Sequence, residues 1–174
     1  METAQQIKNA VRDVADFPAK GVIFKDITPL LSDMNLYNKI IDALADNFIN
    51  KGITKVAGLE SRGFIFGISL AQKLNVPFVP IRKEGKLPYK KISVDYQLEY
   101  GKATVEIHED AVTENDNVLI VDDLLATGGT AKAAISLIKK LKGKVAACAF
   151  VIELSFLNGK DSLKDVEYYS LVKY

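Results

Sequence analysis

Two adjacent acids, Asp122 and Asp123, are followed by a short loop of small residues, and this spacing suits one kind of chemistry. The acids end an apolar run at residues 118–121, and residues 126–130 read Ala-Thr-Gly-Gly-Thr before a helical pattern begins. A glycine-rich loop that opens a helix exposes several backbone N–H groups, which bind phosphate with the help of the helix dipole. Neighbouring carboxylates accept hydrogen bonds from sugar hydroxyls or help to hold a magnesium ion. The pattern therefore predicts a site for a phosphorylated sugar.

Two commoner phosphate-binding motifs do not fit this segment. A P-loop has Gly-x-x-x-x-Gly-Lys-Ser/Thr, but no lysine follows Gly128 and Gly129. A dinucleotide-binding fold has Gly-x-Gly-x-x-Gly after its first strand, and the sequence lacks that motif. The alternative is that the acids only end a strand and the loop only caps a helix. A cap requires neither two acids nor two glycines in this order, so we favour the phosphate site.

This segment resembles the phosphoribosyl pyrophosphate signature of the type I phosphoribosyltransferase family, and the resemblance extends over most of the chain. Residues 16–31 are similar to the base-binding segment of the adenine-specific members, and residues 58–64 to their pyrophosphate loop. Residues 82–88 and 98–101 match their mobile catalytic loop. The signature indicates the family, whereas the first two segments indicate adenine as the base.

The resemblance implies both a fold and a reaction. The fold is of the α/β class, with a mainly parallel central sheet flanked by helices, a small N-terminal base-binding hood and a mobile loop. We expect a single domain at residues 1–174, with the hood at about residues 1–33 and the mobile catalytic loop at about residues 82–102. The implied reaction, in purine salvage, transfers the 5-phosphoribosyl group from phosphoribosyl pyrophosphate to adenine and yields AMP and pyrophosphate.

The resemblance also implies a cofactor and a partner. Mg²⁺ is the expected cofactor, carried by the substrate near Asp122 and Asp123 without a dedicated protein site. A homodimer is expected, with Arg82 or its neighbours approaching the active site of the other copy.

Each part of phosphoribosyl pyrophosphate has an expected place by this resemblance. The 5-phosphate belongs on residues 126–130, the ribose diol on Asp122 and Asp123, and the pyrophosphate on the loop that begins at Glu60. In that loop we expect a cis peptide between Glu60 and Ser61, while the alternative for Arg62 is a surface ion pair. The expected contacts of the whole substrate are Glu60, Ser61, Arg62, Arg82, Lys83, Lys86, Tyr100, Asp122, Asp123, Ala126, Thr127, Gly128, Gly129 and Thr130.

A cationic cluster of Arg82, Lys83 and Lys86 is followed by a Gly/Pro loop. Such a charge run is usually a solvated face, but it also suits a lid that clamps an anion and excludes water. By resemblance, Glu99 handles the N7 or N9 proton of the base and Tyr100 closes over the phosphates. Without the resemblance, Glu99 would be only a polar residue at the end of a strand. The expected catalytic residues are Glu99, Tyr100, Arg62 and Lys83.

Adenine is expected, by resemblance, to contact Ile23, Phe24, Lys25 and Leu154. Backbone groups of Ile23 and Lys25 pair with the exocyclic amine and ring N1, Phe24 stacks on the ring, and Leu154 packs on the opposite side. Family members commonly have arginine at the position of Lys25. A backbone contact survives that difference, whereas a contact through a guanidinium does not. The alternative is that residues 22–24 form an ordinary core strand.

Two other functions fit part of the sequence. A transferase for a 6-oxopurine or a pyrimidine would share the signature, and only the first segment favours adenine firmly. A regulator that binds phosphoribosyl pyrophosphate without turnover would carry a DNA-binding module or a degraded catalytic loop. The sequence shows no extra module and retains Lys86, Glu99 and Tyr100, so we favour the enzyme.

Composition limits the class of protein and its partners. The 174 residues are 48% hydrophobic and 26% charged, which is typical of a soluble globular domain. The net charge of +1 argues against binding of nucleic acid by bulk charge. The single cysteine, Cys148, excludes an internal disulfide and fits a buried position in a strand. Because the sequence shows neither a secretory signal nor a membrane-length apolar run, we expect no membrane contact and a cytoplasmic location.

Periodicity predicts the elements that position these residues. Helices are expected at residues 7–14, 36–48, 64–74 and 131–141, and strands at residues 56–59, 77–81, 94–100, 103–108, 118–121, 144–153 and 166–172. Residues 16–29 and 82–93 read as irregular segments. In strand 103–108, Val105 and Ile107 should share one face, and His108 should be solvated. Because strands alternate with helices, we expect the loops after residues 59, 81 and 121 to meet at one edge of a parallel sheet.

Overall fold

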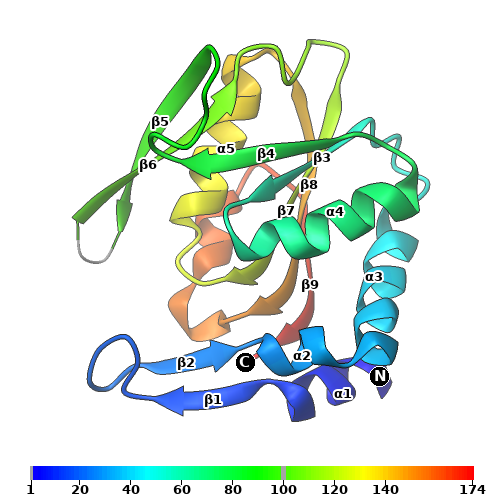
Figure 1. Ribbon diagram of the computed structural model, residues 1–174, viewed down its shortest axis with the longest axis vertical. Helices are drawn as coiled ribbons and strands as arrows, with labels where there is room; N and C mark the ends of the chain where they lie inside the picture. The colour runs from blue at the N-terminus through cyan, green and yellow to red at the C-terminus, as the bar shows by residue number, and fades with distance from the viewer. Residues whose placement is uncertain (1, 99–100) are drawn as a thin grey trace.

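A seven-stranded sheet runs through the centre of the structure (Figure 1), a computed structural model that describes residues 2–98 and 101–174. Its strands are β3 (Lys55–Leu59), β4 (Phe78–Lys83), β5 (Lys91–Leu98), β6 (Gly101–His108), β7 (Asn117–Leu125), β8 (Lys144–Glu153) and β9 (Tyr168–Lys173). The strand order is β5-β6-β4-β3-β7-β8-β9. The neighbouring strands β4, β3, β7, β8 and β9 are parallel to one another, while β6 is antiparallel to both β4 and β5. The expected mainly parallel α/β sheet is confirmed.

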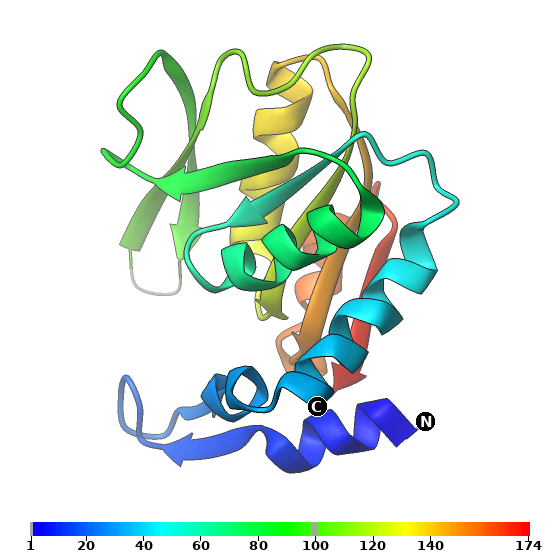
Figure 2. The same cartoon turned by 45° about the vertical axis from the view of Figure 1, so that its right-hand side comes forward.

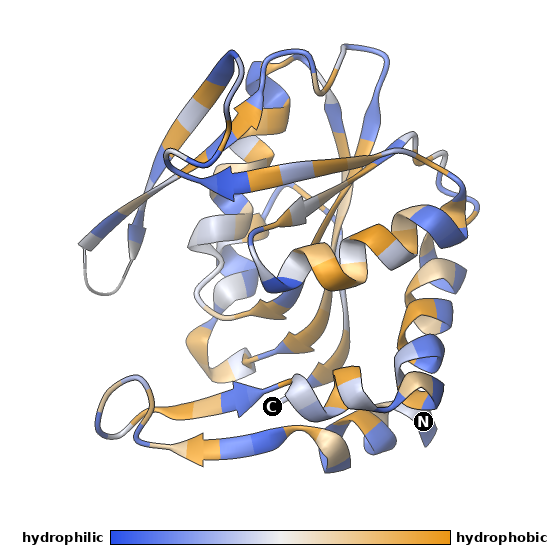
Figure 3. Ribbon diagram, viewed as in Figure 1, coloured by the Kyte–Doolittle hydropathy of each residue, from blue (hydrophilic) through white to orange (hydrophobic). Residues whose placement is uncertain are grey.

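Three helices cover the two faces of this sheet, namely α3 (Met34–Phe48), α4 (Arg62–Leu74) and α5 (Gly129–Lys140). The helices α3 and α4 lie on one face and α5 on the other, as the two views together show (Figures 1 and 2). Successive side chains of a strand point to opposite faces. Accordingly, Leu119 and Val121 of β7 pack with α3 and α4, whereas Val118 and Ile120 pack with α5. A strand buried on both faces reads as a continuous apolar run, which the central strands show in Figure 3.

A small N-terminal unit lies at one end of the molecule. It consists of α1 (Glu2–Ala10), β1 (Arg12–Ala15), β2 (Ile23–Asp26) and α2 (Thr28–Ser32). The strands β1 and β2 form an antiparallel hairpin that is a separate two-stranded sheet. The flanking helices anchor the unit, because Ile7 and Leu30 are fully buried in the same core as α3. Two short 3₁₀ helices, η1 (Ser155–Leu157) and η2 (Gly159–Leu163), connect β8 to β9.

The N-terminal region differs from the sequence prediction in two places. The helix predicted at residues 7–14 ends at Ala10, and Val14 lies instead in β1, where it pairs with Phe24. Residues 16–29 were expected to be irregular but contain β2 and the start of α2. Both predictions were wrong because the hairpin is stabilised by pairing between two segments, which the periodicity of either segment alone does not record.

The strand that carries the acids is longer than predicted. Residues 118–121 were expected to form the strand, but β7 continues through Asp122 and Asp123 to Leu125. On one side β3 accompanies it only as far as Val121, while β8 remains paired with it to Leu125 on the other. The acids therefore lie in a stretch of strand with one neighbour, and their other side opens toward the site.

The segment at residues 82–93 is also more regular than predicted. Here β4 extends to Lys83 and β5 begins at Lys91, because both strands pair with β6. In Figure 3 most of β4 is hydrophobic, but its arrowhead is hydrophilic, so the charged residues of the strand lie at its carboxyl end.

The predictions for four single residues are tested by their burial. Val105 and Ile107 are both buried, as expected for one face of β6. His108 was expected to be solvated but is partly buried, with its ring 6.0 Å from that of Tyr89. Cys148 is fully buried, and this burial raises the pKa of its thiol to about 12.

Within residues 2–98 and 101–174, no helix has both the length and the apolar character needed to cross a membrane.

Candidate active site

The carboxyl ends of β3, β4 and β7 bring the expected loops to one edge of the sheet. A cavity of about 640 Å³ opens there. It contains eight of the predicted site residues, drawn from the hood, from three strand ends and from the start of α5. These residues are Phe24, Glu60, Ser61, Arg62, Lys83, Asp122, Asp123 and Thr130.

A second, more apolar cavity of about 380 Å³ lies between the hood and the end of β8. All four residues predicted to contact a base line it, namely Ile23, Phe24, Lys25 and Leu154. Ala126 and Thr127 of the predicted phosphate loop line it as well. Phe24 and Arg62 belong to both cavities, so the apolar space and the polar space are neighbours with a shared wall.

Arg62 occupies the boundary between the two cavities. It is the first residue of α4, and its Nε lies 3.0 Å from Oδ2 of Asp123. Its guanidinium carbon lies 5.2 Å from the centre of the Phe24 ring, a cation–π distance. Arg62 does form the ion pair of the alternative, but the pair does not lie at the surface, because the Asp123 side chain is only 4% exposed. Gly63 permits this start of the helix, since a Cβ there would lie 2.7 Å from the Val121 carbonyl oxygen.

The two acids of β7 repel each other in a setting where Asp123 is buried and Asp122 is half-buried. Burial, with the Asp123 charge second, raises the pKa of Asp122 well above its ordinary value. Burial also raises the pKa of Asp123, although the Arg62 guanidinium opposes the rise. The Asp123 N–H donates to Oδ1 of Asp122 at 2.9 Å and holds the two groups together. Such a pair favours a ligand that offers hydroxyl hydrogens or positive charge.

The predicted phosphate loop opens α5 as expected. Gly128 is the N-cap residue with φ of 80°, and no side chain caps the helix. The first amides of the helix therefore have no partner within it and remain available to an anion. Behind the loop, η2 packs so closely that a Cβ on Gly128 would lie 2.4 Å from the Gly159 carbonyl oxygen. Ser162 also donates to the Thr127 carbonyl oxygen at 3.0 Å.

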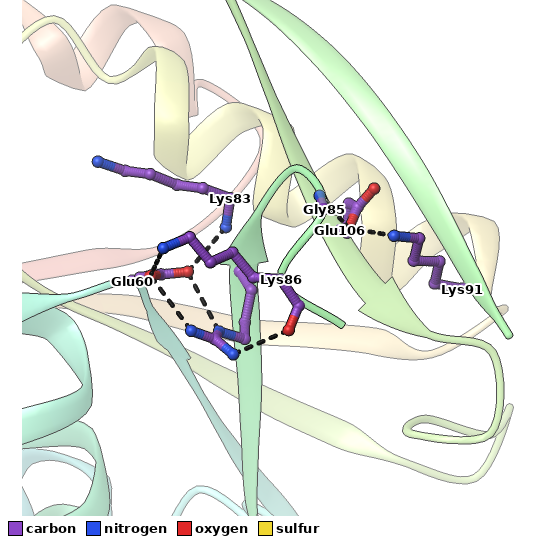
Figure 4. A network of polar contacts seen from close by, with 7 residues as sticks. Glu60, Lys83, Gly85, Lys86, Lys91 and Glu106 are labelled. Atoms are coloured by element: carbon purple, nitrogen blue, oxygen red, sulfur yellow. Dashed lines mark hydrogen bonds and ion pairs between the residues drawn. The ribbon is translucent and has the colours of Figure 1, made fainter. Parts of the chain in front are cut away.

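The Glu60 carboxylate contacts the cationic residues at the end of β4 (Figure 4). Arg82 contacts its carboxylate through Nε at 3.2 Å, and the backbone N–H of Lys83 donates to it at 3.0 Å. Nζ of Lys86 lies 3.9 Å away. Partial burial alone would raise the pKa of Glu60, but the hydrogen bonds from Arg82 and Lys83 outweigh it and keep the pKa below its ordinary value.

The remaining predicted residues have different surroundings. Arg82, Lys86 and Gly128 line neither of the two cavities, because the first two pair within the Glu60 network and Gly128 is buried against η2. Gly129 lines a neighbouring cavity of about 410 Å³ beside β5. The peptide between Glu60 and Ser61 is cis, as predicted. Glu99 and Tyr100 lie outside the described residues.

Several residues of the site were not predicted. Glu84, Tyr96, Ala103 and Thr104 line the larger cavity, and Val22, Leu124 and Leu157 line the apolar one. Val22 and Leu124 adjoin predicted residues, so a wider window around each motif would have found them. Leu157 and Gly159 follow β8 by several residues, and nothing in their local sequence points to the site. Among the described residues, no three Asp, Glu, His or Cys side chains come together as a metal-binding group.

Comparison with known proteins agrees with this geometry. Residues 28–172 match the family described as the phosphoribosyl transferase domain. An adenine phosphoribosyltransferase of Nitrosococcus oceani is 53% identical, over 98% of this chain and 99% of its own length. One of Methylococcus capsulatus is 52% identical, over 97% of this chain and 99% of its own length.

Solved structures give the same result in three dimensions. The adenine phosphoribosyltransferase of Thermoanaerobacter pseudethanolicus has a TM-score of 0.96 at 47% identity, covering 98% of this chain and 99% of its own. That of Saccharomyces cerevisiae, complexed with an imino-altritol bisphosphate and adenine, has a TM-score of 0.92 at 41% identity, covering 98% of each chain. With near-complete coverage at this identity, the chain belongs to the adenine phosphoribosyltransferases of the phosphoribosyl transferase family.

Proposed function

We propose that this chain converts adenine and phosphoribosyl pyrophosphate to AMP and pyrophosphate, with the base and the sugar phosphate in the two adjoining cavities. The observation that carries the proposal is the wall of Phe24 and Arg62 that the two cavities share. A base in the apolar cavity and a ribose in the polar one then meet at that wall. Holding both reactants in this way supplies the positioning on which a transfer reaction depends.

The proposal assigns a role to each group, and the surroundings of these groups support it. Backbone groups of Ile23 and Lys25 pair with the edge of adenine, Phe24 stacks on its ring, and Leu154 packs against the opposite face. The backbone contact is insensitive to the presence of lysine rather than arginine at position 25. Asp122 and Asp123 accept the ribose hydroxyls, and residues 126–130 hold the 5-phosphate at the start of α5.

The pyrophosphate is assigned to Ser61, Arg62, Arg82, Lys83 and Lys86. As it leaves, the anomeric carbon gains positive charge, so catalysis depends on stabilising the leaving group and excluding water. In this assignment Arg82 and Lys86 exchange their contact with Glu60 for the pyrophosphate when the loop at about residues 82–102 closes. Glu99 then handles the proton of the imidazole ring and Tyr100 covers the phosphates.

Magnesium is assigned to the oxygens of phosphoribosyl pyrophosphate rather than to a protein site. When bound, the ion supplies charge neutralisation for the leaving pyrophosphate. The closest carboxylates would be Asp122 and Asp123, whose mutual repulsion in a buried setting suits the approach of positive charge. The hood at about residues 1–33 and the mobile loop complete one catalytic domain over residues 1–174. We also assign the protein to the cytoplasm.

A homodimer is also part of the proposal. Met34 on α3 and Ile65 and Ile68 on α4 are large apolar side chains that are 60%, 39% and 52% exposed. The hydroxyl of Tyr37 donates to the Ile65 carbonyl oxygen at 2.7 Å, so α3 and α4 are in contact close to these side chains. An apolar face of this kind supports association with a second copy. Light scattering of the purified protein gives the mass in solution and checks this.

A steady-state assay with four bases tests the function. Adenine, guanine, hypoxanthine and xanthine are each supplied with phosphoribosyl pyrophosphate and magnesium, and release of pyrophosphate is followed. We expect turnover of adenine well above that of the other three. Turnover of hypoxanthine without adenine would assign the chain to 6-oxopurines instead. Binding of phosphoribosyl pyrophosphate without turnover of any base would favour a regulator.

A further inference from the structure

The hairpin of the hood, which carries the residues assigned to the base, is not part of the central sheet. Its strands β1 and β2 share no backbone ladder with the seven-stranded sheet among the described residues. Its position relative to the base cavity therefore depends on side-chain contacts. One of these is the contact of Phe24 with Arg62, which lies on the side of the cavity shared with the ribose site.

A second contact lies at the end of β9, next to β2 (Figure 1). Nζ of Lys25 is 4.1 Å from the centre of the Tyr174 ring, and Nζ of Lys8 is 5.5 Å from it. Lys25 also pairs with Asp13 of β1 at 2.6 Å, and its side chain is only 11% exposed. An ammonium over an aromatic face interacts most strongly where water is excluded, as it is around Lys25. One ring thus contacts cations from both α1 and β2.

Tyr174 is in turn fixed to the opposite wall of the base cavity. Its N–H donates to the Glu153 carbonyl oxygen at 2.9 Å, and its own carbonyl oxygen accepts from the Ser155 N–H at 2.9 Å. These two bonds bracket Leu154, which lines the cavity opposite the hood. The ring of Tyr174 therefore connects the wall formed by residues 22–25 with the wall that contains Leu154.

We propose that Tyr174 is a positioning residue for adenine: its ring, through the ammonium of Lys25, sets the distance between the two walls of the base cavity. The inference rests on the proposed function of that cavity. The ring and not the hydroxyl does this, because the Tyr174 hydroxyl is buried without a hydrogen-bond partner among the described residues. An aliphatic side chain of similar size would fill the same space but would not attract the ammonium.

Two substitutions separate attraction from packing. Tyr174→Leu should raise the KM for adenine by roughly 5- to 30-fold, the range expected for loss of a desolvated cation–π contact. The KM for phosphoribosyl pyrophosphate should change by less than about twofold, because among the described residues of the hood only Phe24 lines that cavity. Tyr174→Phe keeps the aromatic face and should restore the KM for adenine to within about twofold of the original.

The matched control is Tyr168→Leu. Tyr168 begins β9, and Nζ of Lys173 lies 5.6 Å from its ring, so the change removes a similar cation–π contact from the same strand but leaves the Tyr174 ring and Lys25 unaltered. It should leave both KM values unchanged. An unchanged KM for adenine in Tyr174→Leu would overturn the inference. A parallel rise in both KM values with a lower Tm would overturn it too, since that pattern marks a general loss of packing.

A second variant keeps the test decisive if Tyr174→Leu does not fold. Lys25→Met removes the ammonium but keeps an unbranched apolar chain, and binding of adenine is followed by calorimetry. We expect weaker adenine binding in Lys25→Met. Unchanged adenine binding in Lys25→Met would reject the inference. Failure of the proposed function would look different, because the unaltered protein would then neither bind nor turn over adenine.

Discussion

Arg62 lies 3.0 Å from Asp123 through its Nε, while its guanidinium carbon lies 5.2 Å from the Phe24 ring. Arg62 and Asp123 come from segments about sixty residues apart, the start of α4 and the end of β7. One planar group thus contacts the ribose side and the base side of the site at once. Lysine has neither the fork of nitrogens nor the plane that this requires.

Arg62→Lys should therefore weaken the binding of both substrates. We expect the KM for phosphoribosyl pyrophosphate to rise by about tenfold or more, as loss of a hydrogen bond to a charged group costs about 1.5–3 kcal/mol. The KM for adenine should rise by a smaller factor through the weaker stack on Phe24. Steady-state kinetics measures both. Arg12→Lys is the control, because the Arg12 side chain is 65% exposed and lies as far as 3.7 Å from its partner Asp26. Unchanged KM values in Arg62→Lys would contradict the assignment.

Asp122→Asn should stabilise the fold while impairing binding. Because burial and the Asp123 charge raise the pKa of Asp122 in the folded state, ionisation favours unfolding as the pH rises above the ordinary value of 3.8. Below that pH the carboxyl is protonated in both states and the substitution should have little effect. Near neutral pH we expect a Tm higher by roughly 2–4 °C, which about 1 kcal/mol produces in a domain of this size.

Thermal unfolding at acidic and neutral pH, without ligands, tests this directly. Calorimetry with phosphoribosyl pyrophosphate should then show weaker binding to the stabilised variant, since an amide is a poorer acceptor for ribose hydroxyls. A lower Tm near neutral pH would show that ionised Asp122 stabilises the fold and would reject the prediction.

Gly159→Ala should damage the phosphate loop from behind. A Cβ at residue 159 would lie 2.1 Å from the Ala126 carbonyl oxygen, so the backbone of the loop must move. Overpacking of this kind costs about 1–3 kcal/mol, and we expect the KM for phosphoribosyl pyrophosphate to rise more than about tenfold. Gly52→Ala is the control. It has φ of 62° and open space around it, so it should lower stability by about 1 kcal/mol without changing either KM.

Asp116 should contribute to stability against acid. Burial would raise its pKa, but the Thr113 N–H, Lys55 and the hydroxyls of Thr113 and Thr54 hold the pKa to about 2. Its contribution is then fully present above about pH 4 and lost as the pH falls toward 2. Asp116→Asn should cost about 2 kcal/mol of unfolding free energy at neutral pH, and the difference should vanish in strong acid. Urea unfolding from pH 7 to pH 2 measures this difference in unfolding free energy.

Asp110→Asn, at an exposed position, should have no effect and serves as the control. A pH-independent difference for Asp116→Asn would contradict the explanation.

Glu99→Gln should separate chemistry from binding. Glu99 lies outside the described residues, and its assigned role is proton transfer at the imidazole ring of the base. Loss of a general acid or base lowers turnover by about 10²- to 10⁴-fold, so we expect kcat to fall in that range. The Kd for phosphoribosyl pyrophosphate should change by less than about threefold. Exposed Glu109→Gln serves as the control, and a kcat for Glu99→Gln close to that of the control would remove Glu99 from the mechanism.

The sequence by itself determined the parts of this protein that depend on local order. The apolar run at residues 118–121 and the acids, small residues and glycines at residues 122–130 predict a strand, a short loop and the start of a helix, because each is formed by neighbours in the chain. Period-two and helical patterns predict the elements from α3 to β9 with shifted ends, because burial on one or both faces determines the residue type at each position. Ser61, Arg62 and Lys83 could be assigned to one site because parallel strands end at one edge.

Tertiary structure alone decided what joins distant segments. The extension of β7 past Val121 depends on β8, and the strand at residues 23–26 depends on β1. The backing of the loop by Gly159 and the contact of Tyr174 with Lys25 likewise join segments far apart in sequence. The physical reason is that periodicity records whether a residue is buried but not against which partner. Pairing, register and close approach are determined only when the packed chain brings the partners together.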